Sequence, residues 1–296
     1  MGYIIKKIST LKSIISKGIR FSYSLEPFPA KMVNYEIYGN IPIKDNENIK
    51  NYKVGIPMAC FCDIPILRAQ THAKKYGNYV IGLDKEYMRY MYSPILNPVI
   101  YCDSENITDM IPYLFLMKNK APFDLISKLN TEENKKEIEQ NGFEKFIKSR
   151  KQNFDNSIYF KFIVNFLSGL FKYYSNPENK NEIYYDEREW RAFWLDKTSE
   201  ETDWIWNADN LSKEDLKICN KVIEKSDLGY ITIESQDIPS AITHIIVKKE
   251  KEKEQIIKHM MSSKQIFGCN SSELSEIDKL KLIGKITSFE RIGRDY

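Results

Sequence analysis

Aliphatic side chains near the start of the chain recur with the period of an α-helix. Residues 8–18 place three of them on one helical face: Leu11, Ile14 and Ile15. Gly18 closes this segment, as glycine commonly does at helix C-termini. Residues 19–23 then alternate between apolar and polar positions as a strand does. The pattern therefore predicts a helix, a glycine and a strand in direct succession.

Further elements follow from the same two periodicities. Strands are expected at residues 54–62, 79–83, 99–102, 190–195, 230–233, 242–248 and 285–289. Helices are expected at residues 66–76, 84–91 and 250–261. Pro57 is expected to break the first of these strands, because proline cannot donate a backbone hydrogen bond. A polar stretch with several prolines at 26–52 predicts a surface loop.

The middle of the chain differs from the rest. Residues 106–175 show helical periodicity, including a charged stretch at 131–140 and an aromatic stretch at 154–174. Strand patterns precede and follow this region, so we expect a helical insertion within a single domain spanning residues 1–296. The predicted class is α+β, with one main sheet.

Composition narrows the function classes. The 44 basic and 41 acidic residues give a net charge of +3, which argues against a surface coated with positive charge for non-specific nucleic-acid binding. The apolar run at the start is too short for a signal peptide, and no apolar stretch approaches the roughly 20 residues that span a bilayer. The 5 cysteines lack the spacing of a disulfide framework. We expect a cytoplasmic protein without membrane association.

Two carboxylates stand out at the head of a predicted strand. Glu187 and Glu189 are two residues apart, so both side chains are expected on the same face. Close carboxylates repel each other, and one of the two is expected to keep a raised pKa suited to proton transfer. The alternative is a charged edge strand whose acidic and basic side chains form surface salt bridges.

A second group of candidate residues lies earlier in the chain. Cys60 and Cys62 follow an apolar strand, and His72 and Tyr76 are spaced to share one helix face. Structural zinc needs four ligands, and the chain has 3 histidines, so no metal site is predicted. Cys62 and His72 remain conceivable as a nucleophilic pair, although small buried cysteines are more common.

The standard nucleotide-binding and hydrolase motifs are missing from the chain. There is no phosphate-binding P-loop, no glycine-rich dinucleotide fingerprint, no zinc-protease motif and no nucleophile elbow. ATPase, dehydrogenase, metalloprotease and α/β-hydrolase functions therefore lose their main support.

Several blocks together resemble the AbiGi-type abortive-infection family, which acts in phage resistance. The blocks are residues 57–65, His72, and residues 76–86, 97–101, 187–191 and 286–292. More distantly, the order of elements is similar to ADP-ribosyltransferases such as the DarT group and CmdT. This resemblance implies an ADP-ribosyltransferase-like mixed β-sheet with the helical insertion.

The resemblance also implies roles for individual residues, with NAD as a co-substrate and no metal. Glu189 would be the catalytic carboxylate, with Glu187 beside it. The residues implied to bind the cofactor are Arg20, Tyr23, Cys60, Cys62, His72 and Tyr76. The second strand carries Cys-Phe-Cys where such enzymes usually carry Ser or Thr.

Three functions follow as expectations. The leading one is a toxin effector of phage defence, an NAD-dependent ADP-ribosyltransferase that modifies nucleic acid, with RNA favoured over DNA or protein. The alternative is a non-enzymatic antitoxin that binds and restrains a partner toxin. A thiol-dependent hydrolase using Cys62 and His72 ranks last. Expected partners are the nucleic-acid acceptor, a cognate antitoxin or toxin protein, and a phage-derived trigger.

Overall fold

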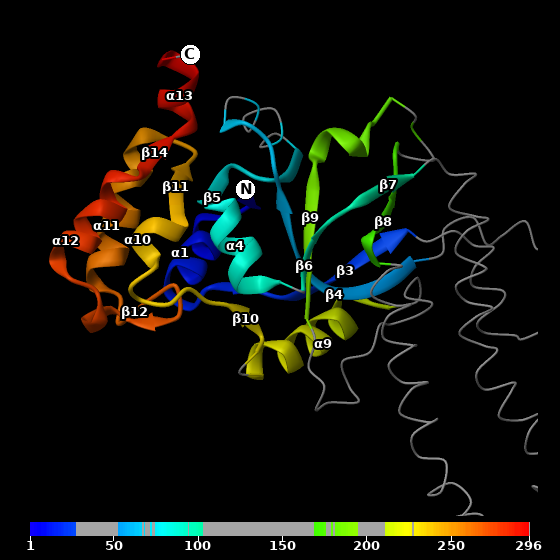
Figure 1. Ribbon diagram of the computed structural model, residues 1–296, viewed down its shortest axis with the longest axis horizontal. Helices are drawn as coiled ribbons and strands as arrows, with labels where there is room; N and C mark the ends of the chain where they lie inside the picture. Colours follow the sequence, from blue (N-terminus) through cyan, green and yellow to red (C-terminus); the bar gives the residue numbers. More distant parts are fainter. Residues whose placement is uncertain are drawn as a thin grey trace, which may run out of the picture.

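The computed structural model describes residues 1–27, 53–66, 68, 72, 75–93, 95–102, 169–175, 179, 181–194, 211–226 and 228–295 (Figure 1). Residues 28–52 of the expected loop at 26–52 lie outside this description. The expected helical insertion at 106–175 lies outside it up to residue 168, and its presence within a single domain stays a prediction.

Short strands and helices alternate along the described chain. The strands are β1 (Gly2–Ile5), β2 (Ile19–Arg20), β3 (Ser22–Pro27), β4 (Lys53–Cys62), β5 (Tyr79–Leu83), β6 (Leu96–Pro98), β7 (Ile100–Cys102), β8 (Phe171–Tyr173), β9 (Glu189–Phe193), β10 (Tyr230–Ile231), β11 (Ile242–Val247), β12 (Gln265–Ile266), β13 (Cys269–Asn270) and β14 (Ile286–Ser288). The helices are α1 (Ile8–Lys17), α4 (Lys85–Tyr92), α9 (Lys213–Lys225), α10 (Ile238–Ala241), α11 (Lys253–Ser262), α12 (Glu276–Gly284) and α13 (Phe289–Asp295). The 3-10 turns are η1 (Tyr184–Glu187), η4 (Glu250–Glu252) and η5 (Ser271–Glu273).

The main sheet has 8 strands in the order β14-β11-β5-β1-β4-β9-β6, with β3 also paired to β4. β11 and β14 run parallel, whereas the other described pairs of this sheet are antiparallel. A mixed sheet combined with helices confirms the expected mixed α and β class. The central strand β1 is not among the expected strands, because four residues are too few to show a periodicity.

The sheet splits along one edge of β4. β3 pairs with the first part of β4, up to Met58, while β1 meets β4 only at Cys62. β9 pairs with the opposite edge of β4 from Met58 to Cys62, so β1 and β3 lie on the same edge. Between their pairings, this edge of β4 has no neighbouring strand among the described residues. A gap therefore opens in the sheet between β1 and β3.

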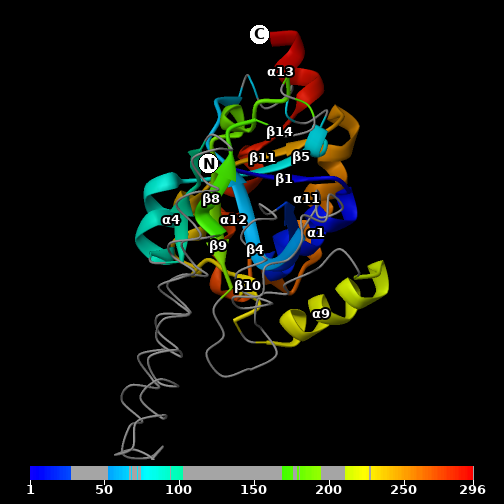
Figure 2. The same cartoon turned by 90° about the vertical axis from the view of Figure 1, so that its right-hand side faces the viewer.

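The apolar core lies against the face of the sheet that α1 covers. Leu11 and Ile15 of α1 are fully buried there, as the helical pattern predicts. In Figures 1 and 2, α1, α11 and α12 lie together beside β5 and β11, whereas α9 lies at the bottom next to β3. Burial of aliphatic side chains at roughly 25 cal/mol per Å² is the main stabilising term for such a core.

Most expected elements are present, and two expectations are wrong. β4 continues through Pro57, because strands pair with β4 on both edges and the carbonyl of Pro57 accepts a hydrogen bond from the amide of Trp194 at 3.0 Å. Residues 171–173 form strand β8, although the aromatic pattern predicts helix there. Pairing with β7, which is far away in the sequence, decides the conformation of this segment.

We expect Gly18→Ala to destabilise the protein by about 2 kcal/mol or more. Gly18 has a φ of 93°, and an added Cβ would clash with the carbonyl oxygen of Ile231. Gly284→Ala is the matched control, since nothing lies within 4 Å of its added Cβ. Urea unfolding measures both variants, and equal effects would contradict the assignment.

Candidate functional site

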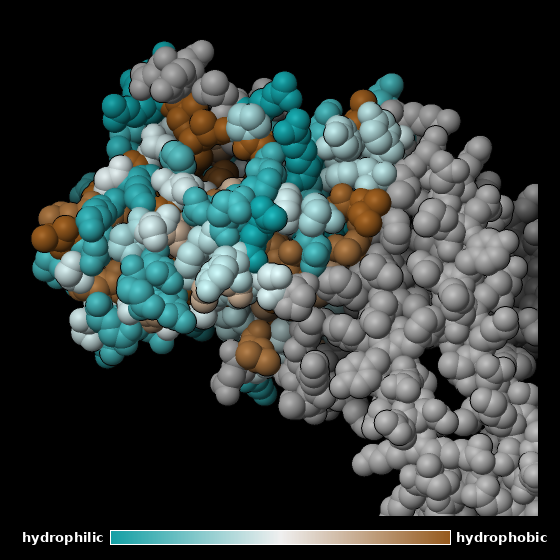
Figure 3. Space-filling view, in the orientation of Figure 1, coloured by the Kyte–Doolittle hydropathy of each residue, from teal (hydrophilic) through white to brown (hydrophobic). Residues whose placement is uncertain are grey.

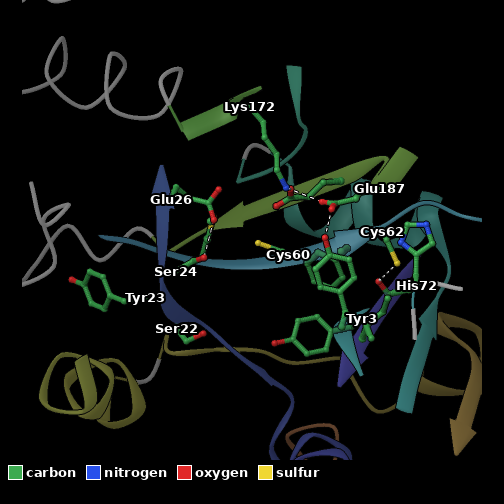
Figure 4. A pocket seen from close by; sticks show the side chains of 16 residues that line it. Tyr3, Ser22, Tyr23, Ser24, Glu26, Cys60, Cys62, His72, Lys172 and Glu187 are labelled. Carbon is green, nitrogen blue, oxygen red and sulfur yellow. Dashed lines mark hydrogen bonds and ion pairs between the residues drawn. The ribbon is translucent and has the colours of Figure 1, made fainter. Parts of the chain in front are cut away.

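A pocket of about 380 Å³ occupies the split in the sheet (Figure 4). Strands β1, β3 and β4 contribute most of its lining residues. The lining residues are Gly2, Tyr3, Ile4, Ser22, Tyr23, Ser24, Glu26, Met58, Cys60, Phe61, Cys62, His72, Tyr76, Lys172, Glu187 and Glu189. The pocket thus brings together residues that are far apart in the sequence, from Gly2 to Glu189.

The alternation of strands explains why polar side chains gather in this pocket. Cys60 pairs with Arg191 and Cys62 pairs with Glu189 across the two antiparallel strands β4 and β9. Directly opposed residues of antiparallel strands point to the same face. Every second residue of β3, among them Ser24 and Glu26, has the same orientation. One face of three neighbouring strands therefore carries the site.

Arg191 is the most deeply buried charge in the described structure, with 1 % of its surface exposed. Its Nε donates to Oε1 of Glu189 at 2.9 Å, and its Nη2 donates to Oε2 of Glu26 at 2.7 Å. Nη1 donates to the carbonyl oxygen of Gly169 at 2.6 Å. These bonds join β9 to β3 and to the segment that begins at residue 169.

Lys172 adds a second cation above the two carboxylates. It extends from β8, and its Nζ lies 2.8 Å from Oε2 of Glu187 and 2.7 Å from Oε2 of Glu189 (Figure 4). The other oxygen of Glu187 accepts hydrogen bonds from the hydroxyl of Tyr76 and from Nζ of Lys75. Glu187 and Glu189 thus share one ammonium group, and each has further donors.

The charge state of Glu189 follows from these contacts. Burial alone would raise the pKa of its carboxyl, but the nearby cations Arg191 and Lys172 outweigh burial and lower the pKa to about 2. Glu189 is therefore not the proton donor of the pair. The edge-strand alternative is wrong, since β9 lies between β4 and β6 and Glu187 and Glu189 are each 8 % exposed.

The thiols at the pocket are protonated. Burial, followed by the charge of Glu189, raises the pKa of Cys60 well above its usual value. Burial also raises the pKa of Cys62 to about 11, and its Sγ donates to the carbonyl oxygen of Gly2 at 3.3 Å. The ring of His72 stacks on Tyr76 with 6.3 Å between centroids. Because the thiolate is the nucleophile, these surroundings oppose a thiol-dependent hydrolase.

The structure brings most of the predicted site residues together. Those around the pocket are Tyr23, Cys60, Cys62, His72, Tyr76, Glu187 and Glu189. Tyr23 lies at the margin, where its amide donates to Oδ1 of Asn220 at 2.8 Å and its ring points towards α9 (Figure 4). Arg20 is not among the lining residues. Its Nη1 lies 3.1 Å from Oε2 of Glu224, outside the pocket.

Three charged residues of the site were not expected from the sequence: Glu26, Lys172 and Arg191. Arg191 had a signal, since it follows Glu189 by two residues in a strand and so shares its face. Glu26 and Lys172 had none, because each lies far from Glu189 in the sequence and only the folded sheet brings them together.

Two further findings concern the described residues as a whole. Within them, no three side chains of the His, Cys, Asp and Glu types gather in a way that would hold a metal ion. Nor does any helix in the described ranges have the length and apolar character needed to cross a membrane.

The fold and the site define a protein of mixed α and β structure with an ion-paired, carboxylate-lined pocket in a split sheet. Residues 41–238 match the sequence profile of a family described as "abortive phage resistance protein AbiGi, antitoxin". The match covers more than half of the chain, so the protein belongs to the AbiGi family of abortive phage resistance proteins.

No curated protein and no solved structure matches this chain. The similarity to ADP-ribosyltransferases such as DarT and CmdT therefore stays a prediction. The family match includes β4, η1 and β9 but not β1 or β3, so it covers Glu187 and Glu189 and leaves out Glu26.

We expect Arg191→Met to cost about 3–5 kcal/mol of stability, because it leaves Glu26 and Glu189 buried without their main cation. Arg89→Ala serves as the control. Arg89 pairs with Glu86 on the exposed surface of α4, where such pairs contribute at most about 1 kcal/mol. A cost for Arg191→Met no larger than that of the control would contradict the network's structural role.

Low pH should destabilise the folded protein through protonation of Glu189. Its folded pKa of about 2 lies below the roughly 4.3 of an unfolded glutamate. The stabilisation is therefore fully present above about pH 4.3 and is lost as pH falls towards 2. We expect Glu189→Gln to show a shallower loss of stability than the parent across this window, measured by unfolding at a series of pH values. Parallel curves would refute the assignment.

Proposed function

We propose that this chain acts as the antitoxin of an abortive-infection pair, binding a partner toxin protein and restraining it until infection. The description of its family supports this role directly. A cognate toxin is thus the partner we expect, and a phage-derived trigger would release the restraint.

The state of Glu189 supports this role physically. Both of its carboxylate oxygens are bonded to cations of the same chain, Arg191 and Lys172. A carboxylate that stabilises positive charge in a transition state must be free to face the substrate. A closed ion-pair network instead stabilises one fixed arrangement of strands, which a protein that works by binding requires.

Expression in bacteria tests the proposal. We expect cells to tolerate this chain alone and to survive the toxin of the same pair only when this chain is co-expressed. Lys217→Ala removes only an exposed pair with Glu214, so it should preserve the protection. Glu189→Gln instead removes the carboxylate that a transferase would need. Poisoning of cells by the chain alone, abolished in Glu189→Gln, would overturn the antitoxin role.

A second candidate is an NAD-dependent ADP-ribosyltransferase acting on nucleic acid, with RNA favoured. Its support is that predicted residues far apart in the sequence, such as Cys60 and Glu189, surround one pocket. The carboxylates of Glu187 and Glu189 suit the hydroxyl groups of a ribose. The lining is less suited to a pyrophosphate: its one described lysine, Lys172, is already bonded to two carboxylates, and Arg20 lies outside.

Labelled NAD distinguishes the two candidates. The purified chain is incubated with labelled NAD and bacterial RNA, DNA or protein, beside Glu189→Gln. The antitoxin role predicts no transfer to any fraction by either protein. Transfer to RNA that disappears in Glu189→Gln would establish the transferase instead.

A further inference from the structure

Two lysine ammonium groups lie at the mouth of the pocket, between carboxylates and the faces of tyrosine rings. Nζ of Lys172 is 4.8 Å from the ring centroid of Tyr184. Nζ of Lys75 is 4.8 Å from the centroid of Tyr76 and 5.4 Å from that of Tyr184. Glu187 contacts both lysines. We call Tyr184, Glu187 and Glu189, the three residues around Nζ of Lys172, the cage.

The chemistry of the cage is that of cation recognition. Aromatic faces attract ammonium and guanidinium groups through the ring quadrupole, and more strongly where water is excluded. Carboxylates add charge-assisted hydrogen bonds. Glu187 and Glu189 are each 8 % exposed, so the cage binds its cation in a largely dry environment.

The charge balance of the pocket depends on Lys172. Three carboxylates line the pocket, those of Glu26, Glu187 and Glu189. Besides Lys172, these carboxylates have the buried cation Arg191, which contacts Glu26 and Glu189. Lys75 is more exposed and is shared with Glu182. Without the ammonium of Lys172, the cage would hold a buried negative charge that lacks its cation, which is costly. Any group that replaces Lys172 must therefore be a cation.

Lys172 belongs to a different part of the fold from Glu189 of the cage. Its strand β8 pairs with β7, and these two strands form a small sheet apart from the eight-stranded one. Glu189 belongs to β9 inside the main sheet. In Figure 4, Lys172 reaches the carboxylates from above, on the side opposite to β4. The carboxylate of Glu189 is thus held by the main sheet, whereas the ammonium comes from a separate small sheet.

The surrounding surface also favours recognition by charge. In the view of Figure 3, the described part is largely hydrophilic, with apolar side chains in separate patches. A broad apolar docking face is not visible on this side of the described residues. A partner approaching this face of the described residues would meet a largely polar surface.

We propose that the cage is a recognition site for an alkylammonium or guanidinium group, filled here by Lys172, and that a lysine or arginine side chain of the toxin takes its place when the two proteins bind. The cation specificity rests on the geometry alone, whereas the toxin as its source rests on the proposed antitoxin function. The cage would then be the contact by which the antitoxin holds its partner.

Chemical rescue tests the cage. Lys172→Ala removes the ammonium, and we expect its unfolding temperature to fall and to recover with added n-butylammonium in a saturable way. Lys172→Ser, which leaves the same space for the added amine, serves as a second variant should the alanine protein not fold. n-Butanol and sodium chloride at equal concentration should not restore either variant. Absence of recovery by n-butylammonium in both would overturn the cage.

Calorimetry completes the test with matched proteins. We expect n-butylammonium to bind Lys172→Ala about tenfold or more tightly than the parent, in which Lys172 competes. Lys217→Ala is the control, because Lys217 forms an exposed pair with Glu214 on α9 and should bind as the parent does. Equal affinity of all three proteins would show that Lys172 does not occupy the site.

The source of the cation is settled by two kinds of probe. N-acetyl-lysine amide and N-acetyl-arginine amide mimic side chains of a protein partner, whereas spermidine represents a free amine. Tighter binding of the side-chain mimics supports the toxin as the source, and tighter binding of spermidine overturns it.

Protection assays separate the two proposals. Protection by the parent chain without any cation binding to Lys172→Ala would sink the cage and leave the antitoxin role standing. Cation binding to Lys172→Ala without protection by the parent chain would overturn the antitoxin role and leave the cage standing.

Discussion

The guanidinium group of Arg191 holds together three segments that are distant in the sequence. It bonds to Glu26 on β3, to Glu189 on β9 and to the carbonyl of Gly169 before β8. A buried cation is costly unless its partners are close and well oriented. The positions of these strands therefore depend on one another through a single side chain. Lys172 extends the same network to η1.

The pocket exists because the sheet cannot stay continuous along β4. β3 and β1 share one edge of β4 and leave a stretch between them unpaired in the described structure. Backbone and side-chain polar groups at such a gap need other partners. Cys62, whose thiol donates to the carbonyl oxygen of Gly2, meets part of that requirement. The same gap that interrupts the sheet thus provides the site.

Membership of the AbiGi family places this chain in abortive phage resistance. Each carboxylate of this network contacts a cation of the same chain, so the proposed entry of a partner's cation would exchange one cation for another. Under this proposal, partner binding would be coupled to the position of β8, since Lys172 would leave the cage together with its contacts. An antitoxin whose release can be triggered would benefit from this coupling.

The sequence by itself determined the local elements. The spacing of Leu11, Ile14 and Ile15 defines α1, and the alternation around Glu189 defines β9. It also marked several of the pocket residues, among them Cys60, Glu187 and Glu189. Helix α9 was not among the expected elements, although Ser212 and Asp215 form a capping box at its start.

Only the tertiary structure decided what those residues do. Arg20 alternates on the expected strand, yet β2 pairs with β10 and turns Arg20 towards Glu224 instead of the pocket. Lys172 lies in a segment whose pattern is helical, and pairing with β7 makes it a strand. Strand pairing and charge pairing join residues far apart along the chain, and no local period records such partners.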